Sequence, residues 1–199
     1  MTQPCFVKST RIRTPEGETR VEDLMIGQSV MTLSGNAQAV KWVGRHAYDP
    51  RFLTARPEAL PVLIRRGALE DGIPHRDLFV SELHALYLDG WLVEARLVEN
   101  GRSIQRQRRW SGPLEYFHVE LDRHNVIYAE GAPAETYLDC GNRGMFQNAE
   151  SFRRLYPTFR ITDQVEWSGR LVRGPALDAI RGRLAQRATA SFPDAGLAS

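Results

Sequence analysis

The chain is poor in lysine and in cysteine. Lys8 and Lys41 are the only lysines among 26 basic residues, so arginine supplies nearly all of the positive charge. The two cysteines, Cys5 and Cys140, are too few for a disulfide framework, and one bridge or two separate thiols fit the sequence equally well. A small scaffold held together by disulfides is therefore excluded.

Long apolar runs are absent as well. No stretch approaches the roughly 20 apolar residues that a helix needs to cross a membrane. Residues 1–4, Met-Thr-Gln-Pro, have neither the charged region nor the apolar region of a secretory signal. We therefore expect no membrane contact and a cytoplasmic location, unless the sequence was cut from a longer exported protein.

Basic charge is not gathered in one region. Residues 1–131 carry 17 basic and 17 acidic side chains, whereas residues 132–199 carry 9 and 7. A nucleic-acid-binding domain normally has a concentrated basic face. The densest basic run is more simply a solvated loop or strand edge, and it consists of Arg102, Arg106, Arg108, Arg109 and Trp110. We expect no nucleic-acid partner.

The hydrophobic pattern predicts an all-β domain followed by a mostly helical extension. The chain has 199 residues, 42% of them hydrophobic, which is enough to bury a real core. Short alternating runs separated by turn residues predict strands up to about residue 131. These runs lie at 10–14, 39–44, 61–65, 77–80, 85–88, 91–93, 116–121 and 125–129, with a proline-containing excursion at 49–60.

The extension, residues 132–199, has a different pattern. Residues 149–156 are typical of a short helix that Pro157 ends. Residues 175–185 place Leu177, Ile180 and Leu184 on one helix face. The last residues, 191–199, are small and polar, as expected of a disordered end.

The first residues resemble a known family. Cys5 leads a short alternating strand that ends at the turn Pro15-Glu16-Gly17, and a second run follows at residues 21–32. This opening is similar to that of the Hedgehog/intein (Hint) domains, in their bacterial subfamily. There a leading cysteine attacks the peptide bond on its own N-terminal side. The family fold has two pseudo-symmetric β halves, and a faint echo of residues 21–30 at 93–104 agrees with it.

Two further blocks extend the resemblance. Residues 77–86 are similar to the block that carries Thr/Ser-x-x-His, which implies that Ser81 and His84 hydrogen-bond the scissile peptide and that the imidazole protonates the leaving amine. Residues 115–131 resemble the closing strand pair. There His118 takes the place of the aspartate that activates the thiol in many inteins, which implies a general base. His124 and Asn125 fall in the turn and are interpreted as structural.

A missing pair decides the expected reaction. Protein splicing needs an asparagine at the domain's end, usually after histidine, and residues 132–139 contain no His-Asn pair. The resemblance therefore implies an autoproteolytic N–S acyl shift at the Pro4–Cys5 bond without splicing. Its substrate would be the chain's own upstream polypeptide, of which residues 1–4 remain, and the acceptor would be water or a small nucleophile. No cofactor is expected.

Two alternatives stay open at this point. Pro4 crowds its own carbonyl and should slow attack by Cys5, so a degenerate Hint scaffold that serves as an interaction module is the first. A zinc site is the second, although its candidate ligands lack the short paired spacing of structural zinc motifs. Those candidates are Cys5, His84, His118 and His124.

Overall fold

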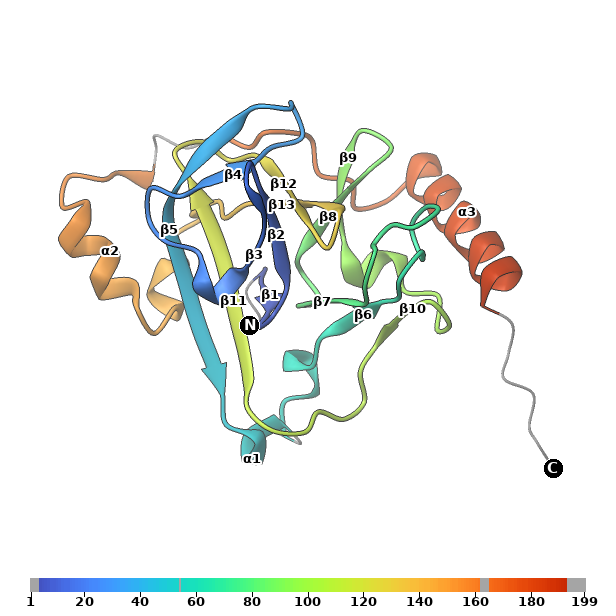
Figure 1. Ribbon diagram of the computed structural model, residues 1–199. Coiled ribbons are helices and arrows are strands. Elements are labelled where there is room, and N and C mark those ends of the chain that lie inside the picture. The colour runs from blue at the N-terminus through green and yellow to red at the C-terminus, as the bar shows by residue number, and fades with distance from the viewer. Residues whose placement is uncertain (1–3, 54, 162–164, 193–199) are drawn as a thin grey trace.

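The computed structural model in Figure 1 describes residues 4–53, 55–161 and 165–192. These residues form two antiparallel sheets, with α2 on one flank and α3 on the other (Figure 1). In the described part of the chain, no helix is long and apolar enough to cross a membrane.

The seven-stranded sheet has β1 at its centre, in the order β10-β6-β7-β1-β11-β5-β4. Its strands are β1 (Phe6–Val7), β4 (Ser29–Met31), β5 (Ala37–Tyr48), β6 (Val62–Ile64), β7 (Leu78–Val80), β10 (Ile104–Arg106) and β11 (Leu114–Leu121). β1 pairs with both β7 and β11, so the N-terminal residues are held between two strands rather than at an edge.

The six-stranded sheet has the order β3-β2-β12-β13-β8-β9. Its strands are β2 (Arg11–Thr14), β3 (Gly17–Arg20), β8 (Ala85–Leu88), β9 (Trp91–Glu94), β12 (Val126–Ala129) and β13 (Ala132–Glu135). A hairpin thus closes each edge, β2–β3 on one side and β8–β9 on the other, while β12 and β13 form the middle.

The two halves repeat the same order of elements. Each edge hairpin is followed by a 3₁₀ turn, at Val21–Asp23 or Ala95–Val98, and then by β4 or β10 at an edge of the seven-stranded sheet. The sequence echo between residues 21–30 and 93–104 falls on these matching turns and strands. The predicted all-β fold of two pseudo-symmetric halves is therefore confirmed.

Alternation along the strands separates two apolar clusters. On β11, Phe117 and Val119 lie in the main core, whereas Leu114 and Tyr116 lie in a second cluster with Cys5. This follows from the two-residue period of a strand, which turns successive side chains to opposite faces. Each fully buried leucine, valine or phenylalanine stabilises the fold by roughly 1.5–3 kcal/mol.

The β structure continues past the boundary expected at residue 131. Glu130 and Gly131 both have positive φ, 49° and 79°, which is the backbone of a type I′ turn between paired strands. β13 follows and pairs with both β12 and β8, so it belongs to the middle of its sheet. The glycine that suggested a domain end is a hairpin turn.

The helices of the extension pack on the β domain. α2 (Ala149–Leu155) ends before Pro157 as predicted, and its Phe152 joins the second cluster beside Trp42. α3 (Pro175–Ser191) buries its predicted apolar stripe in the main core and runs past the expected end at 185. The expected excursion at 49–60 contains α1 (Pro50–Leu53) and a 3₁₀ turn. Most of the expected disordered end, 193–199, lies outside the described residues.

Candidate functional site

The ladder register of β1 brings the predicted site residues together. Phe6 pairs with Val80 on one side and with Phe117 on the other. One residue earlier in the same antiparallel registers, Cys5 stands opposite Ser81 and opposite His118. Directly opposed residues have Cβ atoms roughly 4.5–5.5 Å apart. The central strand therefore places Cys5 between these two side chains.

Two hydrogen bonds join Cys5 to Ser81. The Cys5 N–H donates to the Ser81 Oγ over 2.8 Å, and the Ser81 N–H donates to the Cys5 carbonyl over 2.9 Å. The Ser81 carbonyl accepts from the His84 N–H in a tight turn, over 3.1 Å. The Cys5 N–H therefore donates to the Ser81 hydroxyl and not to the Ser81 carbonyl, which would be its partner in a regular antiparallel ladder. The Cys5 nitrogen belongs to the Pro4–Cys5 peptide, and the serine thus holds that peptide in register.

The Cys5 thiol is enclosed. The residue is only 1% exposed and packs in the cluster that contains Tyr116. Burial raises the pKa of the Cys5 thiol well above its ordinary value, because an apolar surrounding disfavours the thiolate. At neutral pH the sulfur therefore carries its proton and needs a base to become a nucleophile.

The rings of His84 and His118 lie against each other, close to the Phe6 ring of β1. Their ring centroids are 5.0 Å apart, and the Phe6 ring lies 4.2 Å from that of His84. Both residues are buried, and among the described residues none of their four ring nitrogens has a hydrogen-bond partner. The hydrogen bond that the resemblance implied from His84 to the scissile peptide is thus not present; Ser81 alone makes that contact. His118 is in the interior and not on a solvent face.

Burial keeps both rings neutral. It lowers the pKa of His84 to about 4, and it lowers the pKa of His118 well below its usual range, with the His84 ring adding to the effect. The cost of desolvating an imidazolium is the physical reason. At neutral pH each ring can accept a proton on one nitrogen and donate from the other.

A buried carboxylate that the sequence did not indicate lies next to the histidines. Glu135, at the end of β13, accepts hydrogen bonds of 2.7 Å from the Ala85 N–H and from the Arg170 guanidinium. Burial alone would raise its pKa, but His124, His84 and Arg170 outweigh that and lower the pKa of Glu135 to about 2. Glu135 is thus a fixed negative charge beneath His84.

His124 belongs to the same group. It is 2% exposed, and its Nδ1 accepts from the Trp167 N–H over 2.9 Å. The proton of the neutral ring therefore sits on Nε2, which lies 3.6 Å from a Glu135 oxygen. The interpretation of His124 as a turn residue missed this burial. Continued alternation after Gly131 could have indicated Glu135, but nothing in the sequence pointed to Trp167 or Arg170.

A cavity of about 540 Å³ opens on the acyl side of the Pro4–Cys5 peptide. Pro4, His118, Glu135 and Arg170 are among its lining residues, together with Cys140. Cys140 is exposed whereas Cys5 is buried, and both thiols are free, so the structure contains no bridge between them.

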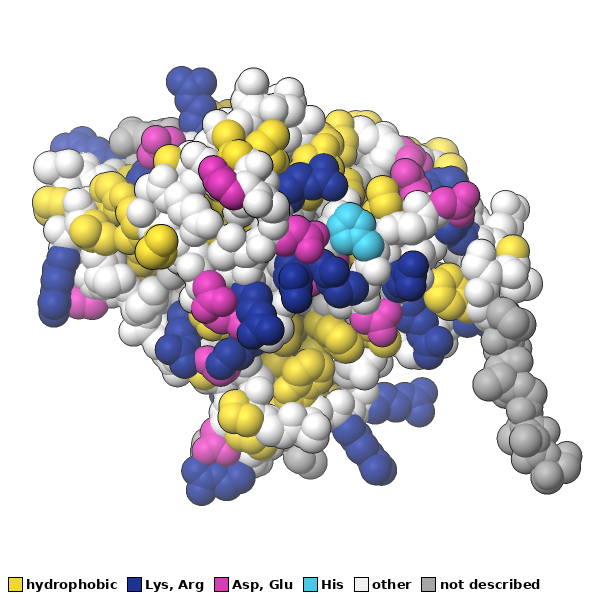
Figure 2. Space-filling model, viewed as in Figure 1, with side chains coloured by type: hydrophobic (Ala, Val, Ile, Leu, Met, Phe, Trp, Pro, Cys, Tyr) yellow, Lys and Arg dark blue, Asp and Glu magenta, His cyan; other side chains and the backbone are white. Residues whose placement is uncertain are grey.

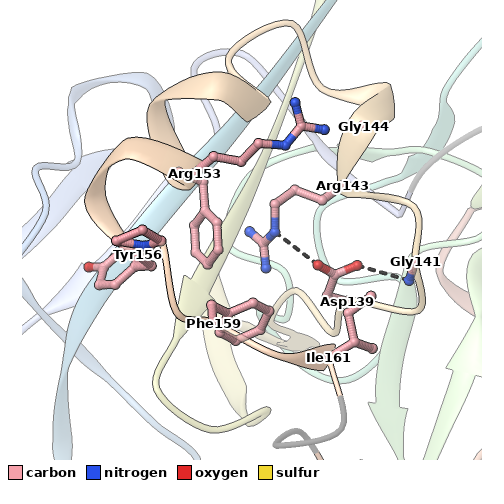
Figure 3. Close-up of a pocket in the computed structure, with 10 residues that line it drawn as sticks. Asp139, Gly141, Arg143, Gly144, Arg153, Tyr156, Phe159 and Ile161 are labelled. Carbon is pink, nitrogen blue, oxygen red and sulfur yellow. Dashed lines mark hydrogen bonds and ion pairs between the residues drawn. The ribbon is translucent and has the colours of Figure 1, made fainter.

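A second cavity, of about 450 Å³, lies between α2 and the loop at 139–144. Figure 3 shows Arg143 pointing toward Asp139, whose other oxygen faces the Gly141 nitrogen. Arg143 also bonds Glu120 through two nitrogens. The buried charges of this cavity are therefore paired with one another, which favours a structural role.

The alternative sites find no support in the described residues. Within them, no group of three or more histidine, cysteine or acidic side chains could hold a metal ion, so the four zinc candidates do not form such a group. Arg106, from the basic run, pairs with Glu82 and Glu99. Acidic and basic side chains are interspersed over the face that Figure 2 shows.

Comparison with known proteins identifies the relatives. The pattern that defines the Hint domain family matches residues 4–141, ten residues past the boundary expected at 131. None of the curated proteins matches the chain. Among solved structures, a bacterial intein-like domain from Clostridium thermocellum is similar, with 13% identity, TM-score 0.49, and coverage of 68% of this chain and 100% of that one.

Two inteins are also similar in structure. The gp41-1 intein has 16% identity and a TM-score of 0.49, covering 67% of this chain and 98% of its own. A DnaB intein from Synechocystis sp. PCC 6803 has 9% identity and a TM-score of 0.45, covering 68% of this chain and 99% of its own.

Proposed function

Because this chain belongs to the Hint domain family, whose fold is associated with autoprocessing or splicing, we propose that it cleaves its own Pro4–Cys5 peptide by an N–S acyl shift, without splicing. The observation that carries the proposal is the 2.8 Å hydrogen bond from the Cys5 nitrogen to the Ser81 hydroxyl. It fixes the nitrogen that must become the leaving amine next to a group that can both accept and donate.

The shift rearranges one acyl group. The Cys5 Sγ attacks the Pro4 carbonyl carbon, the bond from that carbon to the Cys5 nitrogen breaks, and a thioester remains in place of the amide. The thiol loses one proton and the departing amine gains one, so protons balance. Ser81 keeps the amine in place while this occurs, and a positioned acid or base contributes roughly 10² to 10⁴ in rate.

The proton transfers fall to the two neutral histidines. His118 stands opposite Cys5 in the ladder register, and among the described residues no hydrogen bond occupies its ring nitrogens, so we assign it as the base for the thiol. His84 follows Ser81 by one turn and serves the amine side. The Glu135 carboxylate beneath them stabilises positive charge on either ring, since opposite charges attract strongly in a buried site.

The reaction ends by cleavage of the thioester. The chain has no His-Asn pair at residues 132–139 that could release a downstream segment. Its own upstream polypeptide is therefore the substrate, and water or a small nucleophile takes the acyl group. The raised pKa of Cys5 makes the first step slow at neutral pH, and the rate should rise toward alkaline pH as the thiolate forms.

A fusion tests this proposal. A foreign protein is placed ahead of residues 1–4, and the purified fusion is treated with hydroxylamine or an added thiol. We expect release of the foreign protein ending at residue 4, and loss of that release in Cys5→Ala. Ser81→Ala should slow this release without unfolding the protein. Mass spectrometry at successive times measures the release.

The same fusion tests the interaction module, which the burial of the Cys5 thiol and the proline at position 4 favour. A Pro4→Gly variant removes the ring that crowds the carbonyl. If neither the parent fusion nor this variant releases the foreign protein, the autoprocessing proposal is overturned, and the chain is a Hint scaffold without its chemistry.

A further inference from the structure

A segment of the extension docks beside the buried histidines. Residues 166–171, called the strap from here on, lie beyond residue 141, where the match to the Hint family pattern ends. The Leu92 N–H donates to the Gly169 carbonyl over 3.1 Å, and the Leu171 N–H donates to the Leu92 carbonyl over 2.9 Å. The strap therefore runs parallel to β9, as a short addition to that edge of the six-stranded sheet.

The strap bonds groups in the interior of the site. The Arg170 guanidinium donates to a Glu135 oxygen over 2.7 Å, and the Trp167 N–H donates to the His124 Nδ1 over 2.9 Å. Glu135 and His124 are each only 2% exposed. Glu166 accepts from the Arg170 Nε over 3.0 Å, so the arginine is also held from within the strap. Residues outside the matched domain thus supply hydrogen bonds to two buried side chains within it.

The strap also forms part of the cavity wall beside the scissile peptide. Glu166 and Arg170 line the same space of about 540 Å³ as Pro4 and His118. Pro4 contributes the carbonyl carbon that the thiol attacks, and His118 is the proposed base. The strap therefore borders the reacting peptide on its acyl side, and it brings a permanent cation to that wall, because a guanidinium is not deprotonated in proteins.

Arg170 fixes the Glu135 carboxylate in one orientation. One Glu135 oxygen, Oε1, accepts from the Ala85 N–H, and the other, Oε2, accepts from Arg170. Ala85 follows His84 directly, so the carboxylate is held beside that ring through both of its oxygens. Burial lowers the pKa of His84, and Arg170 adds to that effect. Burial raises the pKa of Glu135, and Arg170 is among the groups that outweigh it, because a cation favours a carboxylate and disfavours an imidazolium.

We propose that Arg170 is a positioning residue for cleavage of the Pro4–Cys5 peptide, and that the catalytic unit therefore runs through the strap to residue 171. The inference rests on the proposed function. Arg170 takes no part in making or breaking bonds. It holds the Glu135 carboxylate beside the two histidines, and the carboxylate stabilises the positive charge that arises on His118 when the thiol gives up its proton. Docking of the strap is thus required for full activity.

The pH dependence of cleavage separates this role from a merely structural one. The charged and titratable groups that face His84 are Glu135 on β13, His118 on β11, His124 in the turn after β11 and Arg170 in the strap. Removal of the cation raises the proton affinity of His84, so that ring takes up a proton at a higher pH. An imidazolium at His84 opposes the proton that His118 must accept from the thiol, since like charges repel. Loss of a purely structural contact would instead slow cleavage by the same factor at every pH.

The experiment uses the full chain with a foreign protein fused ahead of residues 1–4, and it follows release of that protein by hydroxylamine at pH 5 and at pH 8. In Arg170→Gln we expect release to be roughly 10²-fold slower than in the parent at pH 8, as for a misplaced group in a site, and slower by a still larger factor at pH 5. Arg170→Lys keeps the charge and should keep the parental ratio of the two rates. Arg183→Gln is the matched control, because it removes an arginine of the extension that pairs with Asp89, and it should release at the parental rate.

The outcomes separate this inference from the function beneath it. Release by Arg170→Gln at the parental rate, or a loss of equal size at the two pH values, overturns the positioning role and leaves autoprocessing intact. Circular dichroism shows whether that variant is folded. If it is not, Arg170→Lys decides: a parental ratio of the rates at pH 5 and pH 8 supports the proposal, and a different ratio overturns it. Absence of Cys5-dependent release from the parent fusion overturns both the inference and the proposed function.

Discussion

Two buried polar clusters lie two residues apart on the same face of β11, and they are built in opposite ways. The histidine cluster consists of His84, His118, His124 and Glu135; the arginine cluster consists of Glu120, Asp139 and Arg143. His118 has no hydrogen-bond partner among the described residues, whereas Glu120 and Arg143 are joined through two nitrogens and Asp139 takes a third.

The difference indicates that the arginine cluster stabilises the fold, whereas the histidine cluster is suited to proton transfer. In the arginine cluster the charge of Arg143 is paired with carboxylates, and Figure 3 shows the pair with Asp139. The face of the guanidinium also packs 3.4 Å from the centroid of the Phe152 ring. In the histidine cluster the ring nitrogens of His84 and His118 are buried without hydrogen bonds, which lowers stability. A fold that retains such atoms next to a strand-held cysteine is consistent with a site that uses them.

The largest effect on the free energy of unfolding is expected from Arg143→Met. The change leaves buried Glu120 with Lys41, 3.9 Å away, in place of the two-nitrogen contact with Arg143, and breaking a buried pair costs about 3–5 kcal/mol. Urea unfolding at neutral pH measures it. Arg153→Met is the matched control, because that arginine pairs with Glu150 on the surface and should cost less than about 1 kcal/mol. Equal losses in the two variants would contradict a stabilising arginine cluster.

A smaller effect is expected from acid. The pKa of His84 is about 4 in the folded protein and about 6.5 in the unfolded chain. The unfolded chain therefore binds the proton first as the pH falls, and stability that is complete above pH 6.5 is lost toward pH 4. His84 should cost about 2 kcal/mol between pH 7 and pH 5, and His118 acts in the same direction.

Urea unfolding at the two pH values checks this expectation. In His84→Gln the loss between pH 7 and pH 5 should shrink. Glu135 does not contribute to the loss between pH 7 and pH 5. Its pKa is about 2 in the folded protein, so its stabilising effect is lost only below its unfolded pKa near 4.3. An unfolding free energy that is the same at pH 5 and pH 7 would show that the histidines are not buried in neutral form.

The smallest effect on stability is expected from His118→Phe. The ring keeps its contacts with Phe6 and Tyr137, and no hydrogen bond is lost, so the free energy of unfolding should stay within about 1 kcal/mol of the parent. Cleavage of the fusion should nevertheless fall by roughly 10² to 10⁴. A variant that is strongly destabilised, or one that cleaves at the parental rate, would remove the contrast between the clusters.

Much of the fold was predictable because local pattern and sheet pairing agree. The alternation at 116–121 correctly separated Phe117 and Val119 from Tyr116 and His118, and the helix at 149–155 ends where its proline requires. The sheet continues past the domain end predicted at about 131, because Gly131 lies in a type I′ turn, and a glycine in such a turn has the same sequence signature as one in a linker. β13 was therefore missed, and Glu135 with it.

The sequence by itself determined the residue types that carry the chemistry and their local placement: a cysteine ahead of a short strand, Ser81 and His84 three residues apart, and His118 on the same strand face as Tyr116. The tertiary structure decided their surroundings. It set the burial that keeps the thiol protonated and both histidines neutral, and it brought Glu135, Arg170 and Cys140 to the site from residues interpreted as a separate extension. Proton affinity depends on burial and neighbouring charge, and both are properties of the folded chain.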